Sequence, residues 1–170
     1  MNDFQIEVLP GTPLGSLYFA LSESGLAGLA FDGPGLKAWR GRFPAANADI
    51  ASGALAGEVR AQLSAYFSGQ RRIFDLPLDL SRLSDFQTRV LSAVSDVPFG
   101  HTSSYGEIAS RIGRPRAYRA VGGANAANPI AIVIPCHRLV GVRGSLRGYG
   151  GGLDRKAWFL AHESRFSRVE

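Results

Sequence analysis

The second half of the chain takes its fold from residues 104–124, which read SYGEIASRIGRPRAYRAVGGA. Ser104 and Glu107 have the spacing of a capping box, and the apolar residues after them predict a helix that ends at Gly113. Pro115 stands where a first helical residue would stand, which predicts another short helix through about residue 124. Two short helices separated by a tight turn that contains glycine are typical of a helix-turn-helix.

The second of these helices combines a positive charge with small side chains. Arg119 is followed directly by Ala120, and Gly122 and Gly123 lie within the next turn. Small side chains let the backbone of a helix approach another surface closely. That surface is either a nucleic acid, contacted together with Arg119, or the interior of the protein, and this segment alone favours neither.

The segments on both sides of the helix-turn-helix have patterns of their own. Upstream, Ser84 and Gln87 form a second capping box at the start of a helix. Downstream, the apolar run 130–134 predicts a buried strand, which leads into Pro-Cys-His-Arg at 135–138. A glycine-rich loop follows, and the last helix is expected from about Leu153 to Glu163.

The first half of the chain is richer in strand signals. Apolar runs at 16–21 and 25–31, bounded by Gly and Pro, predict a small antiparallel sheet. Between residues 52 and 68 the apolar residues recur at spacings of three and four, which predicts one helix. Pro77 cannot lie in a central strand, so residues 74–80 are expected to form an extended connector or an edge strand.

We therefore expect an α+β fold with two domains. Residues 1–79 would form a small α/β domain with an antiparallel sheet and a structural role. Residues 80–170 would form a mainly helical domain with a short sheet and the helix-turn-helix.

Composition narrows the class of protein. The chain has 170 residues, of which 45% are hydrophobic and 19% charged, which argues against intrinsic disorder. It shows no secretory leader and no apolar run long enough for a membrane span, so we expect a soluble, cytoplasmic protein. The single cysteine excludes an internal disulfide and a Cys-rich zinc site.

The charge is unevenly distributed. Residues 1–85 contain 7 Lys and Arg against 9 Asp and Glu, whereas residues 86–170 contain 12 against 5. The net charges of the two halves are thus −2 and +7. This asymmetry indicates a polyanionic partner for the C-terminal half, although an Arg-rich proteome would give the same composition.

Cys136 is the candidate nucleophile. A lone cysteine is usually an inert, small hydrophobic residue, but here His137 adjoins it, and the thiolate form of cysteine is reactive. Either His137 or His162 could take the thiol proton through a water molecule, with Glu163 orienting the imidazole, and the spacing does not choose between the two histidines. A Cys-His hydrolase would use the same groups.

The order of several motifs is more specific than any one of them. The motifs are TPLG at 12–15, PLDL at 77–80, RAVGGA at 119–124, NPIAIVIPCHR at 128–138, GYGGGL at 148–153 and LAHE at 160–163. In this order they resemble the O6-alkylguanine-DNA alkyltransferases, also called methylated-DNA–protein-cysteine methyltransferases, over essentially the whole chain.

The resemblance implies direct reversal of DNA damage. The O6-alkyl group of guanine, mainly methyl, would be transferred irreversibly and once per molecule to Cys136, with the O4-alkyl group of thymine as a further candidate. The damaged base would be flipped out of a double helix that a protein monomer binds through the minor groove. The resemblance implies no cofactor, and the absence of the family's zinc ligands implies no metal.

The resemblance also assigns roles to individual residues. Cys136 would be the nucleophile, His137 the base acting through a water, and Glu163 the residue that holds its imidazole. The remaining assignments are substrate binding by Tyr105, Asn128, Leu139, Tyr149 and Gly150, and DNA binding by Tyr118, Arg119, Ala120 and Gly122, with Arg119 filling the gap that the flipped base leaves.

Three positions need comment. Tyr118 stands where relatives usually carry a small residue, and Leu91 stands where many bacterial relatives have Trp. Lys156 is expected to be structural. Two alternatives remain: an alkyl-lesion-binding protein without catalysis, and a helix-turn-helix regulator with an incidental thiol. Cys136 argues against the first, and the regulator leaves the Pro-Cys-His-Arg motif unexplained.

Overall fold

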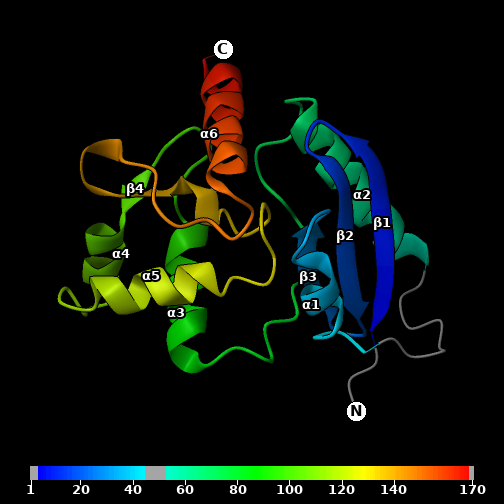
Figure 1. Cartoon of the computed structure of the whole chain (residues 1–170), viewed down its shortest axis with the longest axis horizontal. Helices are drawn as coiled ribbons and strands as arrows, with labels where there is room; N and C mark the ends of the chain where they lie inside the picture. Colours follow the sequence, from blue (N-terminus) through cyan, green and yellow to red (C-terminus); the bar gives the residue numbers. More distant parts are fainter. Residues whose placement is uncertain (1–3, 45–52, 169–170) are drawn as a thin grey trace. The chain divides into compact units, whose positions relative to one another are not determined.

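The computed structural model describes residues 4–44 and 53–168. The chain divides into two compact units, Met1–Ser81 and Arg82–Glu170 (Figure 1). The first unit contains an antiparallel sheet and the second is mainly helical, which confirms the α+β class. The elements of the first unit are β1 (Gln5–Thr12), β2 (Gly15–Ser22), β3 (Gly25–Phe31), α1 (Leu36–Arg40) and α2 (Gly53–Phe67).

The sheet of the first unit has β2 at its centre, with β1 and β3 antiparallel to it. Tyr18 faces Val8 on one side and Ala30 on the other. Apolar side chains on one face pack against a cluster of aromatic rings that includes Trp39 and Phe43. A Cβ on Gly28 would lie 2.4 Å from the Phe43 ring, so glycine is needed for the ring to pack against β3.

Residues 74–80 form an extended segment, as predicted. It makes a short parallel bridge with the start of β3, where Leu26 N–H donates to the carbonyl of Pro77 at 2.8 Å and the Leu26 carbonyl accepts from Asp79 N–H at 2.9 Å. In α2, the buried Gln62 donates to the backbone carbonyl of Asp75 and accepts from its N–H. Backbone groups of the connector are therefore satisfied without a regular ladder.

The second unit consists of helices around a two-stranded parallel sheet, β4–β5, and α5 packs across α3 and α4 (Figure 1). Its elements are α3 (Asp85–Ser95), β4 (Ser103–Ser104), α4 (Tyr105–Arg111), α5 (Tyr118–Ala126), the 3₁₀ turn η1 (Cys136–Arg138), β5 (Leu139–Val140), the 3₁₀ turn η2 (Val142–Gly144) and α6 (Leu153–Ser167).

Both predicted capping boxes are present. Ser84 accepts from the N–H of Gln87 at 3.3 Å, and the Gln87 side chain accepts from the N–H of Ser84 at 3.0 Å. At the start of α4, Ser104 accepts from Glu107 N–H at 3.1 Å, and the Glu107 carboxylate accepts from Ser104 N–H at 2.6 Å. Each box satisfies two N–H groups that the first turn leaves unpaired.

Three predictions of local structure were wrong. Pro115 does not begin α5, because it lies in a turn closed by Ala117 N–H and Arg114 O, and the fixed φ of proline suits such a turn equally well. The three isoleucines of the run 130–134 are buried and its other two residues are half-buried, but the run forms a tight turn rather than a strand. The last helix, α6, continues beyond Glu163 to Ser167.

Candidate active site

The turn before Cys136 is held by Asn128. Its amide nitrogen donates to the carbonyl of Ile134 at 2.9 Å, and its amide oxygen accepts from the N–H of Ile130 at 3.0 Å. Ile132 between them has a φ of +73°, which is uncommon for a β-branched residue. One side chain thus takes the place of the strand partner that the apolar pattern suggested.

Cys136 is the first residue of η1 and is 6% exposed. Burial raises the pKa of its thiol, and a hydrogen bond from Asn128 and the positive charge of Lys156 act in the opposite direction. Because burial outweighs both, the resting group is a neutral thiol, and a base is needed to make it a nucleophile.

The candidate base, His137, adjoins Cys136 in the sequence. His137 is fully buried, and its Nε2 lies 2.7 Å from the Glu163 carboxylate oxygen Oε1. Burial lowers the pKa of His137, as do the charges of Arg138 and Lys156, although Glu163 opposes them. The imidazole is therefore neutral, and since Nε2 donates to a carboxylate, Nδ1 carries the free electron pair.

Nδ1 of His137 has no hydrogen-bond partner among the described residues, so its lone pair is available to accept a proton. His162, the alternative base, instead stacks on the ring of Trp158 at 4.7 Å. The structure thus places His137 on Glu163.

Glu163 is the charged centre of this network. Burial would raise the pKa of its carboxyl group, but hydrogen bonds from His137 and Arg138, together with their charges, lower it to about 2. The guanidinium of Arg138 contacts both carboxylate oxygens at 2.9 Å, and Gly100 N–H donates to Oε2 at 3.1 Å. Glu163 is therefore ionised at neutral pH.

Sequence reasoning assigned no role to Arg138. The residue is 6% exposed and, besides Glu163, donates to the carbonyl of Val97 at 2.6 Å. It balances the buried charge of Glu163, and a buried arginine needs such a partner. Its place directly after Cys136 and His137 was the available signal, but residue 163 as its partner was not visible in the sequence.

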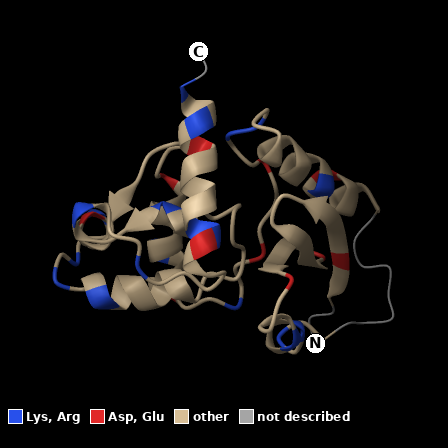
Figure 2. Ribbon diagram, turned by 45° about the horizontal axis from the view of Figure 1, so that its top comes forward, with Lys and Arg blue, Asp and Glu red and all other residues tan. Residues whose placement is uncertain are grey.

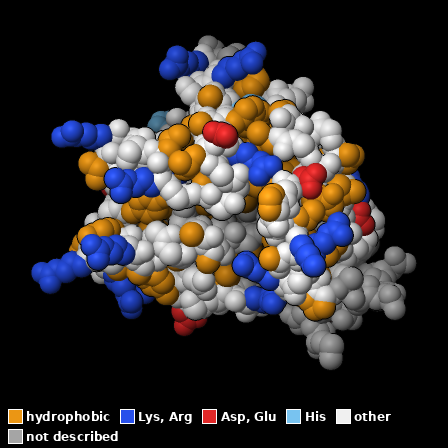
Figure 3. Space-filling model, viewed as in Figure 1, with side chains coloured by type: hydrophobic (Ala, Val, Ile, Leu, Met, Phe, Trp, Pro, Cys, Tyr) orange, Lys and Arg blue, Asp and Glu red, His pale blue; other side chains and the backbone are white. Residues whose placement is uncertain are grey.

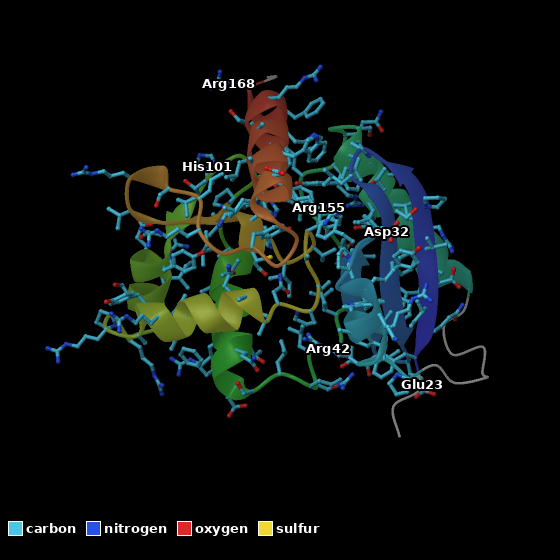
Figure 4. All side chains as sticks on the ribbon, viewed as in Figure 1. Glu23, Asp32, Arg42, His101, Arg155 and Arg168 are labelled. Atoms are coloured by element: carbon cyan, nitrogen blue, oxygen red, sulfur yellow. The ribbon has the colours of Figure 1, made fainter. Side chains whose placement is uncertain are left out.

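The loop of residues 141–152 is bonded to two side chains that interact electrostatically with Cys136. Tyr105 and Lys156 both donate to the carbonyl of Arg147, at 3.2 and 2.8 Å. Arg155, labelled in Figure 4, donates to the carbonyl of Gly151 at 3.0 Å. Lys156 therefore does hold structure, as expected, and its charge also reaches the thiol of the cysteine.

The predicted substrate-binding residues differ in their burial and in their electrostatic interaction with Cys136. Burial raises the pKa of Tyr105 and of Tyr149, and the negative charge that Cys136 carries once it is deprotonated raises both further. Both tyrosines therefore lie near the sulfur. Gly150 is exposed in the loop, whereas Leu139 is fully buried in β5.

The residues predicted to bind DNA gather at the start of α5. Tyr118, Arg119 and Ala120 are exposed, and the Arg119 guanidinium lies 5.9 Å from the centre of the Tyr118 ring. Gly122 faces the other way, and a Cβ on it would lie 3.8 Å from the ring of Tyr105. One end of α5 is thus open to a partner, while its middle borders the site.

Basic residues accompany this exposed end. Figure 2 shows Lys and Arg on α4, on the turn after it and at the start of α5, and Figure 3 shows such side chains projecting from this side of the molecule. The exposed arginines of this segment are Arg111, Arg114, Arg116 and Arg119.

Residues 4–44 and 53–168 lack two other kinds of feature. No helix there is both long and apolar enough to span a membrane. The same residues bring together no group of three or more His, Cys, Asp or Glu side chains that could bind a metal ion.

Comparisons with known proteins agree with this geometry. Residues 9–80 match the ribonuclease-like domain of 6-O-methylguanine DNA methyltransferase, and residues 85–165 match its DNA binding domain. The methylated-DNA–protein-cysteine methyltransferase of Mycolicibacterium paratuberculosis is 60% identical over 114 residues, which cover 67% of this chain and 68% of that protein.

Solved structures extend the similarity to the whole fold. The Mycobacterium tuberculosis O6-methylguanine methyltransferase superposes with a TM-score of 0.82 at 42% identity, covering 100% of this chain and 97% of the other. The M. tuberculosis OGT in complex with DNA gives a TM-score of 0.80 at 43% identity, covering 95% and 93%. With both halves matched in order, the chain belongs to the 6-O-methylguanine DNA methyltransferase family.

Proposed function

We propose that this protein repairs DNA by transferring the O6-alkyl group of guanine, mainly methyl, to Cys136. The observation that carries the proposal is the buried thiol beside a neutral His137, whose Nε2 is bonded to an ionised Glu163. A relative that is 60% identical is named for this chemistry.

The transfer is a displacement at the alkyl carbon. The thiol proton of Cys136 passes through a water to Nδ1 of His137, and the sulfur forms a bond to the carbon. The bond between that carbon and O6 breaks, and its electron pair leaves with guanine, which is then protonated. The product is a thioether, so each molecule acts once and no cofactor takes part.

The departing guanine needs stabilisation because it leaves as an anion. Tyr105 lies near the sulfur with its pKa raised, so its hydroxyl stays protonated and can donate to the purine ring. Tyr149 would form a wall of the pocket and the Gly150 N–H would donate near O6. Leu139, which is fully buried, would support the pocket from β5.

The target base must leave the helix before the sulfur can reach it. We place double-stranded DNA against the exposed start of α5, with Arg119 filling the gap in the stack and Tyr118 beside it. Ala120 and Gly122 would allow close approach to the minor groove. Phosphate contacts would supply most of the affinity, so binding would be largely independent of sequence and sensitive to salt.

The remaining features of the proposal concern the whole molecule. The protein would act as a cytoplasmic monomer, with O4-alkylthymine as a further candidate substrate. Residues 80–170 would carry both DNA binding and alkyl transfer, and residues 1–79 would support them structurally.

The deciding experiment is the intact mass of the protein after incubation with a duplex that contains one O6-methylguanine. We expect one added methyl group, mapped to Cys136 and absent in Cys136→Ser. An unmodified protein that still prefers the damaged duplex would instead be a lesion-binding protein. A preferred DNA sequence without alkylation would indicate a helix-turn-helix regulator.

A further inference from the structure

The helix that carries Arg119 also contacts the candidate nucleophile. Asn125, near the end of α5, donates from its amide nitrogen to the backbone carbonyl of Cys136 at 3.2 Å. Its side chain is 4% exposed. Asn125 is not among the site residues proposed above. Its partner Cys136 lies 11 residues further along the chain, after the turn that Asn128 holds.

The oxygen of the same amide group differs from its nitrogen in its hydrogen bonding. The Oδ1 atom of Asn125 is buried and has no hydrogen-bond partner among the described residues. A buried acceptor without a partner is costly, and an apolar side chain of similar size would avoid that cost. The fold alone therefore does not account for an asparagine here, whereas the bond to the carbonyl of Cys136 does.

The position of Asn125 along α5 connects its bond with Cys136 to the end of the helix that is predicted to bind DNA. Arg119 is exposed at the start of the helix, Gly122 borders the ring of Tyr105 one turn later, and Asn125 reaches Cys136 in the turn after that. A helix transmits displacement along its axis because its backbone bonds are internal. The same element thus borders the predicted DNA face, the purine-binding tyrosine and the nucleophile.

We propose that Asn125 is a positioning residue that fixes the peptide of Cys136 to the helix that binds DNA. This inference rests on the proposed alkyl transfer and names one residue that sets its geometry. By holding the first residue of η1, Asn125 sets the distance between the sulfur and the alkyl carbon of a base delivered by α5. Displacements of about 1 Å in such contacts can slow a reaction about 100-fold.

The test measures transfer from an O6-methylguanine duplex under single-turnover conditions over a range of protein concentrations. This separates the maximum rate from the Kd of the duplex. For Asn125→Leu, which is close in size, we expect a maximum rate about 10- to 100-fold lower with Kd within about twofold of the wild type. Ala126→Leu, at the neighbouring exposed position, is the matched control and is expected to leave both quantities unchanged.

Two further measurements separate positioning from other effects. The pH profile of the maximum rate in Asn125→Leu should keep its shape, because the base and the charges around the thiol are untouched. Asn125→Ala, which removes the amide without adding an apolar side chain, should show the same defect. A wild-type maximum rate in both variants, or a shifted pH profile, would overturn the proposal.

A probe that needs no DNA keeps this inference distinct from the proposed function. Iodoacetamide alkylates thiols preferentially and the chain has a single cysteine, so the rate of labelling mapped to Cys136 by peptide mass reports access to that residue. We expect faster labelling in Asn125→Leu, because η1 loses a restraint, and no change in Ala126→Leu. If the wild type transfers no methyl group, the proposed function fails, while equal labelling of wild type and Asn125→Leu would refute the restraint itself.

Discussion

Replacing Glu163 by Gln tests the charged network directly. The wild-type carboxylate accepts from His137 and Arg138 at Oε1, and from Arg138 and Gly100 at Oε2. A glutamine of equal size offers one oxygen and one NH₂ group. Whichever way the amide is turned, its NH₂ faces two donors, and Arg138 loses the negative charge that balances it.

The structure gives the size of the effect. The Glu163 carboxyl has a pKa of about 2 instead of its ordinary 4.5, and each pKa unit corresponds to about 1.4 kcal/mol, which makes about 3 kcal/mol of folding free energy. Removing one partner of a buried ion pair generally costs about 3–5 kcal/mol. We therefore expect Glu163→Gln to lower the free energy of unfolding by at least about 3 kcal/mol at pH 7.

The dependence on pH has a definite sign. The pKa of Glu163 is lower in the folded than in the unfolded state, so its stabilisation is complete above about pH 4.5 and is lost as the pH falls toward 2. The stability difference between wild type and Glu163→Gln should therefore shrink through this range. The glutamine side chain does not titrate, so the free energy of unfolding of Glu163→Gln should not show this particular loss at low pH.

The assay is urea unfolding in a pH series, with Asp154→Asn as control. Asp154 is exposed in the first turn of the same helix, α6, and its loss should cost at most about 1 kcal/mol. A Glu163→Gln protein within about 1 kcal/mol of the wild type at pH 7 would refute the reasoning. So would a difference that stays constant as the solution is acidified.

Three further predictions concern charge and backbone. Lys156→Met removes a charge that lowers the pKa of the nucleophile, so the transfer rate at neutral pH should fall and its pH profile should move to higher pH. Gly25→Ala should cost more than about 3 kcal/mol in urea unfolding, because its Cβ would lie 2.3 Å from the carbonyl oxygen of Pro77. Gly15→Ala meets no atom within 4 Å and should cost only about 1–2 kcal/mol of backbone strain. Arg116→Ala should reduce the slope of log binding constant against log salt by about one, as measured by titration with duplex DNA.

Local signals predicted the local structure well. A capping box requires two side chains three residues apart, so Ser104 and Glu107 identify the start of α4 without any knowledge of the fold. The strands over 16–21 and 25–31 were predicted because glycine and proline bound their apolar runs. The order of motifs was specific enough to identify the family.

Contacts between distant residues were not predictable in the same way. The apolar run 130–134 is equally compatible with a buried strand and with a buried turn, because periodicity reports burial and not hydrogen bonding. Asn128 decides between strand and turn, because its side chain makes hydrogen bonds with backbone groups that a neighbouring strand would otherwise have bonded. The pairing of Arg138 with residue 163 likewise requires α6 to pack against η1, which no short pattern encodes.

The arginine beside the pair explains how the site keeps a usable base. A carboxylate 2.7 Å from an imidazole favours the protonated ring, and a protonated His137 could accept nothing from a thiol. Burial and the positive charge of Arg138 act against Glu163 and hold the pKa of His137 down. Arg138 and the Gly100 N–H also occupy the other acceptor positions of the carboxylate, so that Glu163 orients the ring through Nε2 without keeping it charged. A proton-accepting Nδ1 at neutral pH is therefore a property of all three residues together, and orientation by Glu163 alone would not produce it.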